Sequence, residues 1–481
     1  MKINKLLYHL LVAAVLLPSC KKSFLNELPS NAVTITDAIK TQSDLADATN
    51  GMYNLMKAYT LFGRDVPVLG DLLADNTYVN VSNSGRYLTE NNYTFINTTA
   101  EMSDIFSQGY YCILQANRVI YEGQKFAASG NTNQLIGEAY AARGLIYLEL
   151  VNWFGAPYTV NPNADGVPII TLPSYVTGFT LKLPRSSVSA VYARIITDLD
   201  SAYALMPATG TTLHATNSDY IAKYAAKAIE SRAYLYKGDY PNALAAAQLV
   251  INNGGYTLAQ TPAAFSAFWT SPTATTTKLE TIFELNENAS SNNGNNGVDA
   301  IYSQSGYGDI QATTDLYNDY SATDSRKTLM INGTRGGQQA YIINKFPNYT
   351  NTDKDETKII RLAEVILTAA ESYARTGDEP DALKALNQIA QLRDPSFAGY
   401  SSTGAQLITD ILNERRKELA FEGLRFFDFT RLNLAFTRPA QPQGYASYPT
   451  VSTSDIRRIL PIPQAETDAN PNISQNPGYS K

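Results

Sequence analysis

Carboxylates repeat every four residues in one segment near the end of the chain. Glu414, Glu418 and Glu422 would share one face of a helix, and paired carboxylates are the groups that hydrolyse glycosides. The cations that interleave with them or follow them are Arg415, Arg416, Arg425 and Arg431. Guanidinium groups lower the pKa of a neighbouring carboxyl, whereas a general acid needs its pKa raised. We therefore expect a structural seam of ion pairs here, with Gly423 ending the helix.

The chain lacks the residues that other catalytic sites and metal-binding sites need. The chain has two histidines, His9 and His214, and two cysteines, Cys20 and Cys112. A Cys112–His214 pair is formally possible, but neither residue lies in a recognisable motif, so we expect a packed thiol and a surface imidazole. No nucleophile elbow, phosphate-binding loop, dinucleotide fingerprint or EF-hand loop is present. The sequence predicts no catalytic residue, no cofactor and no metal site.

The first residues have the pattern of a secretory signal. Lys2 and Lys5 precede an apolar run over residues 6–17, which is too short to span a bilayer comfortably, and no second such run follows. Residues 17–20 resemble a bacterial lipobox, so we expect residues 1–19 to be removed and Cys20 to carry the lipid. The alternative is an ordinary signal peptide that happens to end near a cysteine. Lipidation would anchor the protein to a membrane without spanning it.

Charge and cysteine content narrow the possible partners and cross-links of the mature chain. Removing residues 1–19 removes two lysines and no acid, which changes the formal charge from −6 to −8 and argues against nucleic acid as a partner. With Cys20 lipidated, Cys112 has no cysteine with which to form an intrachain disulfide. A hydrophobic core must therefore stabilise residues 20–481, which we expect to form one large domain.

One turn occurs twice in the chain. Residues 238–244 (Gly-Asp-Tyr-Pro-Asn-Ala-Leu) match residues 377–383 (Gly-Asp-Glu-Pro-Asp-Ala-Leu), and a tyrosine, Tyr234 or Tyr373, precedes each glycine by four residues. Apolar residues at helical spacing flank the turns, and glycine followed by Asp and Pro has the chemistry of one helix ending and another beginning. This spacing is typical of tetratricopeptide hairpins. It predicts helical hairpins at about 221–252 and 360–392.

Two further segments predict helices, residues 134–153 and 188–206, because their apolar residues repeat on one face. Polar regions rich in Asn, Ser, Thr, Gly and Tyr separate the helices, chiefly at 60–100, 255–310 and 433–455. The sequence therefore predicts an all-α scaffold that carries long ordered loops and few short strands.

Several blocks together resemble the SusD/RagB family of Bacteroidota outer-membrane lipoproteins. The earlier blocks are Cys20 with Phe24-Leu25 and Pro29; Phe106, Tyr110, Ile113 and Asn117; Glu138-Ala139, Ala142-Arg143, Tyr147 and 154–157; 185–188 with Asp198-Leu199; and 360–364. The strongest block is 413–423, which continues to 425–428 and Arg431 and is followed by 461–463 and 476–479. Asn26 and Thr467 depart from the family's commoner residues. The resemblance covers nearly the whole mature chain.

The resemblance implies a binding protein rather than an enzyme. Such proteins sit on a SusC-like TonB-dependent barrel at the outer membrane and capture glycans or, in some branches such as RagB, peptides. It implies that the helical repeats serve the scaffold and that the ligand lies against exposed aromatic rings on a loop-rich face, here about 60–100 and 255–310. A peptide-binding importer subunit, an outer-membrane glycoside hydrolase and a pure helical scaffold remain alternatives to a glycan-binding subunit that faces the cell exterior.

Aromatic residues in the loop regions are the candidates for ligand binding, because a ring covers the apolar face of a sugar while charged and amide groups bind its hydroxyls. Trp153 lies in a helical pattern and is expected to be packed, whereas Trp269 lies between prolines in surroundings typical of an ordered loop or short helical turn. The further candidates are Tyr78, Tyr87 and Tyr93 with Asp75 and Arg86, and the pair Tyr302 and Tyr307. Each tyrosine could also be an ordinary half-buried loop residue. No family motif marks these positions.

Overall fold

The longer helices pack one after another along the chain. The computed structural model describes residues 38–178, 181–214, 217–445 and 448–480. The expected signal segment and Cys20 lie outside the described residues. The scaffold helices are α2 (Gln42–Met56), α5 (Ala100–Gly123), α6 (Gly130–Phe154), α8 (Val188–Leu205), α9 (Lys223–Lys237), α10 (Tyr240–Asn253), α14 (Leu362–Thr376), α15 (Glu379–Arg393) and α16 (Gly404–Glu418).

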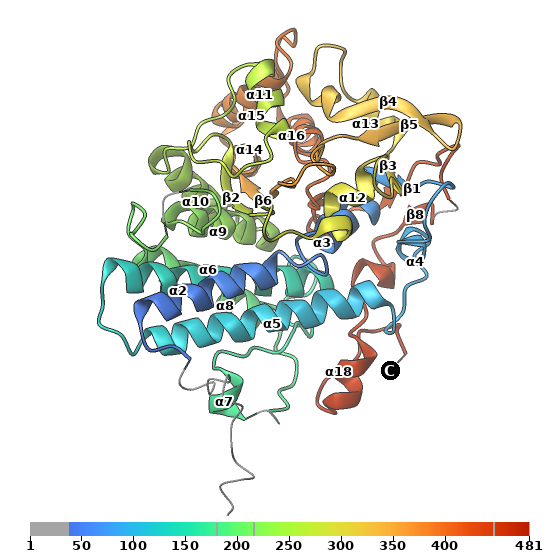
Figure 1. Cartoon of the computed structure of the whole chain (residues 1–481). Coiled ribbons are helices and arrows are strands. Elements are labelled where there is room, and N and C mark those ends of the chain that lie inside the picture. The colour runs from blue at the N-terminus through green and yellow to red at the C-terminus, as the bar shows by residue number, and fades with distance from the viewer. Residues whose placement is uncertain (1–37, 179–180, 215–216, 446–447, 481) are drawn as a thin grey trace, which may run out of the picture. The chain divides into compact units, whose positions relative to one another are not determined.

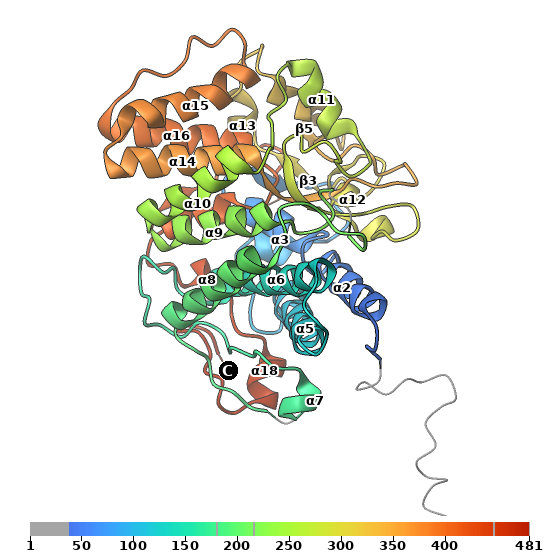
Figure 2. The same ribbon diagram turned by 90° about the vertical axis from the view of Figure 1, so that its left-hand side faces the viewer.

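Each of these helices contacts its neighbour in the series, and α14 contacts both α10 and α16. Figure 2 shows them layered from α15 near the top to α5 near the bottom. Apolar stripes line the contacts. In α6 the series Leu145, Leu148 and Trp153 is wholly buried, so this helix is central to the core. The expected packing of Trp153 is confirmed.

The two repeated turns have the same geometry. Gly238 and Gly377 end α9 and α14 in the left-handed region, with φ of 75° and 91°, a conformation that glycine adopts without strain. Asp239 and Asp378 then cap α10 and α15 by accepting a hydrogen bond from the backbone N–H three residues later, with a proline in the first turn of each helix. Both predicted hairpins are confirmed.

Short strands and helices fill the segments between the hairpins. A four-stranded antiparallel sheet has the order β1-β3-β5-β4, formed by β1 (Thr77–Val79), β3 (Ile310–Ala312), β5 (Gln338–Ile343) and β4 (Met330–Arg335). Two smaller pairs are β2 (Thr281–Leu285) with β6 (Thr357–Arg361), and β7 (Phe436–Thr437) with β8 (Thr450–Val451). Figure 1 shows the four-stranded sheet beside α12 and α13, away from α5 and α6. The all-α prediction with few short strands is confirmed.

Of the eight remaining short helices in the described residues, four lie in the expected loop regions and four outside them. They are α3 (Asp65–Leu72), α4 (Leu88–Asn91), α7 (Ser174–Thr177), α11 (Pro262–Thr270), α12 (Val298–Tyr302), α13 (Thr314–Asn318), α17 (Arg425–Arg431) and α18 (Gln464–Ala469), with 3-10 turns at Gly294–Asn296, Ser325–Leu329 and Ile456–Arg458.

The role expected for Gly423 is wrong, because α16 ends five residues earlier, at Glu418. Gly423 has φ of 80°, and its N–H donates to Asp71 Oδ2 over 2.8 Å. A Cβ on Gly423 would lie 2.6 Å from the Cα of Pro67 in α3. This glycine therefore allows two backbone segments to approach closely and does not cap the helix.

Candidate ligand-binding face

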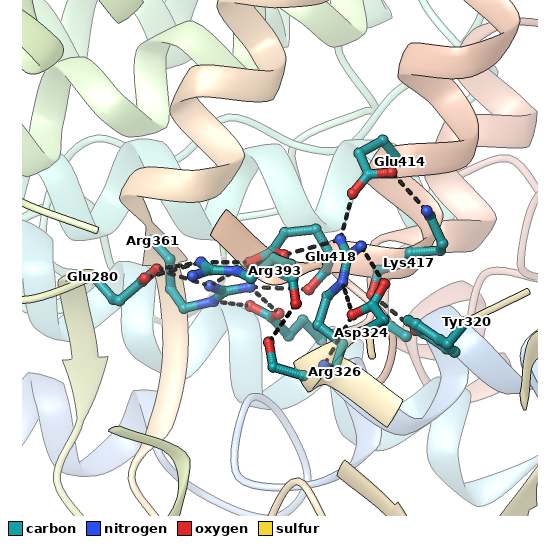
Figure 3. A network of polar contacts seen from close by, with 12 residues as sticks. Glu280, Tyr320, Asp324, Arg326, Arg361, Arg393, Glu414, Lys417 and Glu418 are labelled. Carbon is teal, nitrogen blue, oxygen red and sulfur yellow. Dashed lines mark hydrogen bonds and ion pairs between the residues drawn. The ribbon is translucent and has the colours of Figure 1, made fainter. Parts of the chain in front are cut away.

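The carboxylates with catalytic spacing are buried in ion pairs (Figure 3). Glu418 Oε1 lies 3.1 Å from Arg361 Nη1 and 3.1 Å from Arg393 Nη2, and Glu280 lies on the other side of these arginines. Glu414 pairs with Arg326 over 2.6 Å. The seam joins α15 and α16 to the last residue of β6, to the residue before β2 and to the 3-10 turn Ser325–Leu329.

The electrostatics of this seam oppose acid catalysis. Burial alone would raise the pKa of Glu418, but the charges of Arg393 and Arg361 outweigh it, so the net pKa is lowered. The pKa of Glu414 and that of Glu422 are lowered in the same way, against burial, chiefly by Arg326 and Arg361 respectively. These carboxylates are held ionised in a structural seam, as expected, but the expected partners are wrong. Arg415 pairs with Asp428, and Arg431 pairs with Asp428 and Glu371. Arg416 and Arg425 both pair with Asp75.

Trp269 is not exposed, which corrects the leading aromatic candidate. Pro262 begins the helix α11 instead of bounding a loop, and Thr261 caps it through its hydroxyl, which accepts from Ala264 N over 3.1 Å. Trp269 is 2% exposed and packs against Phe265 and Phe268. A ring enclosed in this way presents no face to a ligand.

Four candidate tyrosines are also buried, so their expected exposure is wrong. The exposed fractions are 6% for Tyr78, 2% for Tyr87, 1% for Tyr93 and 0% for Tyr302. Three of them have partners within the fold: the hydroxyl of Tyr87 donates to Asp65, that of Tyr93 donates to Leu73 O, and the Tyr302 ring stacks on Phe346. Burial of a large ring provides more stability than its exposure in a loop, which explains the outcome.

Asp75 is likewise committed to an internal pair. Its carboxylate accepts from Arg425 Nε over 2.8 Å and Nη2 over 3.0 Å, and Arg416 lies 3.4 Å away. Burial raises its pKa and Arg425 lowers it more, so the net pKa of Asp75 is lowered. The expected grouping of Asp75 with Arg86 is therefore wrong.

Arg86 and Tyr307 meet, although the sequence suggested that they belong to different groups. The Arg86 guanidinium lies 3.6 Å from the centre of the Tyr307 ring, and both side chains are half-buried. Arg86 Nη1 also donates to Ser84 Oγ over 2.8 Å. The Ser84 N–H donates to Asp309 Oδ1 over 2.9 Å, which ties this turn to the segment that precedes β3.

Arg335, the last residue of β4, joins this arrangement. Its Nε donates to Ser82 O over 2.9 Å, and its Nη1 donates to Gln304 Oε1 over 3.3 Å. We call the set Ser84, Arg86, Gln304, Tyr307, Asp309 and Arg335 the loop cluster. It brings together parts of the two loop regions, 60–100 and 255–310, expected to form the ligand face.

A second pair of rings lies on the same sheet. Tyr317 of α13 and Tyr341 of β5 stack with centroids 3.9 Å apart, and both are half-buried. Lys327 Nζ lies 4.5 Å from the Tyr317 centroid. Sequence reasoning missed these rings because residues 311–341 were outside the expected loop regions, and missed Arg335 although Gly336-Gly337 marks its turn.

His214 is buried, so the expectation of a surface imidazole is wrong. His214 Nδ1 lies 2.8 Å from Glu138 Oε2, and its ring stacks on Tyr220 at 3.9 Å. Cys112 is packed in α5 as expected, and burial raises the pKa of its thiol. In the described ranges no group of three or more His, Cys, Asp or Glu side chains is placed to hold a metal ion. No helix within those ranges is long and apolar enough to cross a membrane.

Known proteins match both halves of the chain. A model described as the SusD family matches residues 330–479, and one described as starch-binding associating with outer membrane matches residues 23–235. The SusD-like protein P2 of Formosa agariphila is 27% identical, over 98% of this chain and 99% of that protein.

Solved structures match the fold as a whole. A SusD superfamily protein from Bacteroides thetaiotaomicron is 30% identical with a TM-score of 0.81, covering 91% of this chain and 100% of that one. A SusD superfamily protein from Bacteroides vulgatus is 26% identical with a TM-score of 0.84, covering 92% of this chain and 100% of that one. The chain belongs to the SusD/RagB family of outer-membrane-associated carbohydrate-binding proteins.

Proposed function

We propose that this protein is a lipid-anchored subunit at the cell surface that captures oligosaccharide or polysaccharide and delivers it to a SusC-like TonB-dependent transporter. Family membership supports the class of ligand, since one matching model is described as starch-binding and outer-membrane-associated. We assign the ligand to the loop cluster, and the stack of Arg86 on Tyr307 is the observation that carries this assignment.

The chemistry of the loop cluster suits a neutral glycan. The Tyr307 ring offers apolar surface for a sugar ring, and Arg86 holds it in place from one side. Arg86 stacks on the ring, and Arg335 donates to Tyr307 O and to Gln304 Oε1, so guanidinium and amide groups lie close to Tyr307. Gln304 is exposed, and both arginines are half-buried. Such groups donate hydrogen bonds to sugar hydroxyls.

No catalytic step is assigned to the protein. The carboxylates whose spacing resembles that of a glycosidase are the ionised members of the buried seam around Glu418. A general acid for glycoside cleavage would have to be protonated near neutral pH.

The ligand class is tested by titrating the mature chain with a panel of soluble starch, xylan, mannan, pectin and a tryptic peptide mixture. We expect at least one neutral polysaccharide to retard the protein in affinity gels. Binding to the peptides alone would replace the glycan proposal with the peptide-binding alternative.

The delivery step is tested by solubilising outer membranes in mild detergent and purifying the tagged protein. We expect a barrel transporter to copurify with it. Recovery of the tagged protein without any barrel protein, under conditions that keep other outer-membrane complexes intact, would contradict delivery.

A further inference from the structure

A second polar pocket lies beside α2 and shares no residue with the loop cluster. Its volume is about 250 Å³, and its walls come from α2, from residues just before α9 and from the loop that follows β2. The lining residues of α2 are Asn50, Tyr53 and Asn54, which are three or four residues apart or adjacent and so share one side of the helix, and Lys57 follows as its C-cap. Asn50 and Asn54 are exposed, so the mouth of the pocket opens to the surface.

The loop wall is fixed by the end of α2. Lys57 Nζ donates to Ser291 O over 2.6 Å, to Ser291 Oγ over 2.7 Å and to Asn286 O over 3.1 Å. All three donors of this ammonium group are therefore engaged by the wall. The pocket is formed before any ligand enters it, which lowers the entropic cost of binding.

Asp219 lines the pocket, and one of its carboxylate oxygens is buried without a partner. Asp219 Oδ2 accepts from Asn286 Nδ2 over 3.1 Å, whereas Oδ1 accepts no hydrogen bond from any described residue. Burial, aided by the charge of Glu284, raises the pKa of Asp219 to about 6. The carboxylate is therefore mostly ionised at neutral pH and can only accept hydrogen bonds. A ligand that donates a hydrogen bond to Oδ1 would satisfy it.

An aromatic ring is held rigidly next to this oxygen. Tyr220 lines the pocket and stacks on His214 with an interplanar angle of 10°. Glu138 in turn holds the His214 ring, and Tyr53 meets the Tyr220 ring edge-on at 5.7 Å. The pocket thus combines a positioned aromatic ring, a hydrogen-bond acceptor and carboxamides at its mouth.

We propose that this pocket is a second carbohydrate site that binds a single neutral sugar ring through Asp219, Tyr220 and the carboxamides of Asn50 and Asn54. The ligand class rests on the proposed function. The volume is below the roughly 300 to 1,000 Å³ of pockets that hold drug-sized ligands, so it suits one ring and not a chain. The only lysine in the lining is engaged by the wall, while Asp219 repels anions, so a uronic acid is excluded.

The test uses the mature chain with D-glucose, D-galactose, D-mannose and D-xylose as probes in saturation-transfer NMR, and D-galacturonate as the charged comparison. At least one neutral sugar binds and D-galacturonate does not. Asp219→Asn lowers the affinity roughly tenfold or more, the loss expected when a hydrogen bond to a charged group is weakened. Asp47→Asn, an exposed carboxylate on α2, leaves binding unchanged.

The double variant Asn50→Ala/Asn54→Ala guards against misfolding of the Asp219 variant, because both side chains are exposed. It also weakens the monosaccharide signal. An unchanged signal in both pocket variants, or binding of D-galacturonate as tight as that of the neutral sugars, overturns the proposal.

The measurements distinguish an error in the pocket proposal from an error in the proposed function. The pocket proposal alone is refuted by two results together. Polysaccharide binds and this binding is lost with Tyr307→Ala, while no monosaccharide signal changes in the pocket variants. Absence of binding to every polysaccharide and monosaccharide refutes the glycan function and, with it, the ligand class of the pocket.

Discussion

The Nζ of Lys345 lies 4.3 Å from the centre of the Trp269 ring, and both residues are only 2% exposed. Lys345 also donates to Ala420 O over 2.7 Å and to Glu422 Oε1 over 2.6 Å. Burial lowers the pKa of Lys345 to about 8, although the charge of Glu422 raises it. The indole therefore covers one end of the buried ion-pair seam.

Replacing Trp269 tests its role as a core residue. We predict that Trp269→Ala lowers the free energy of unfolding by roughly 3 to 5 kcal/mol, because it leaves a large cavity beside buried charges. Thermal unfolding followed by circular dichroism measures this. Tyr111→Ala, at a tyrosine that is 57% exposed on α5, is the control and leaves the melting temperature nearly unchanged. A Trp269→Ala protein as stable as the wild type would refute the core assignment.

Removing the central carboxylate of the seam tests its ion pairs. Glu418→Gln leaves Arg361 and Arg393 buried with less compensating charge. We predict a loss of about 3 to 5 kcal/mol in the free energy of unfolding. Asp47→Asn, the same chemical change at an exposed position, costs little. Urea unfolding at neutral pH gives both values, and equal stability of the two variants would contradict the role of the seam.

The same variant makes a prediction about pH. Because the folded-state pKa of Glu418 lies below the ordinary value of about 4.3, its stabilising contribution is fully present above that value. It is lost as the pH falls toward the folded-state pKa, since the unfolded state binds more protons there. The stability difference between wild type and Glu418→Gln should therefore narrow below about pH 4. A difference that stays constant or widens on acidification would show that the pKa is not lowered.

The glycine turn between α14 and α15 can be tested without creating a steric clash. Gly377 has φ of 91°, and a Cβ added there would meet nothing within 4 Å. We predict that Gly377→Ala costs about 1 to 2 kcal/mol from backbone strain alone. Gly130→Ala is the control, because this glycine starts α6 with equal space and an ordinary φ, so alanine there is neutral or stabilising. Equal effects of the two substitutions on the melting temperature would count against the left-handed cap.

The proposed membrane attachment depends on Cys20. We predict that Cys20→Ala abolishes lipidation and releases the mature protein into a soluble periplasmic fraction, because no acyl chain remains to hold it. Fractionation and immunoblotting of cells that express either form measure this. Retention of the alanine variant in the membrane fraction would contradict anchoring through Cys20.

Local signals in the sequence were sufficient to predict the hairpins. The conformation of Gly377 and the cap at Asp378 depend on neighbours within a few residues, so the pattern of Gly, Asp and Pro predicts them directly. A seam of buried ion pairs was also predictable, since alternating charges on one helix need partners when they are buried. Its partners were not, because Arg326, Arg361 and Arg393 come from other segments of the chain.

The exposure of loop aromatics could not be predicted in the same way. Trp269 is buried by Lys345 and Lys358, which lie far from it in the sequence, and Tyr302 is buried by Phe346. The partner of Arg86 proved to be Tyr307, because the sheet brings segments more than two hundred residues apart together. Burial of a ring in a loop region depends on such tertiary contacts, which no short-range pattern encodes.

The central claim is that the loop cluster binds glycan through the Tyr307 ring. Isothermal titration of the mature chain with the polysaccharide that binds most tightly in the panel tests it most directly, using Tyr307→Ala with Tyr111→Ala as the matched control. We predict that Tyr307→Ala weakens binding by about 1 to 3 kcal/mol with little change in the melting temperature, while Tyr111→Ala binds like the wild type. Equal affinities of Tyr307→Ala and wild type would contradict the assignment of the ligand to this face.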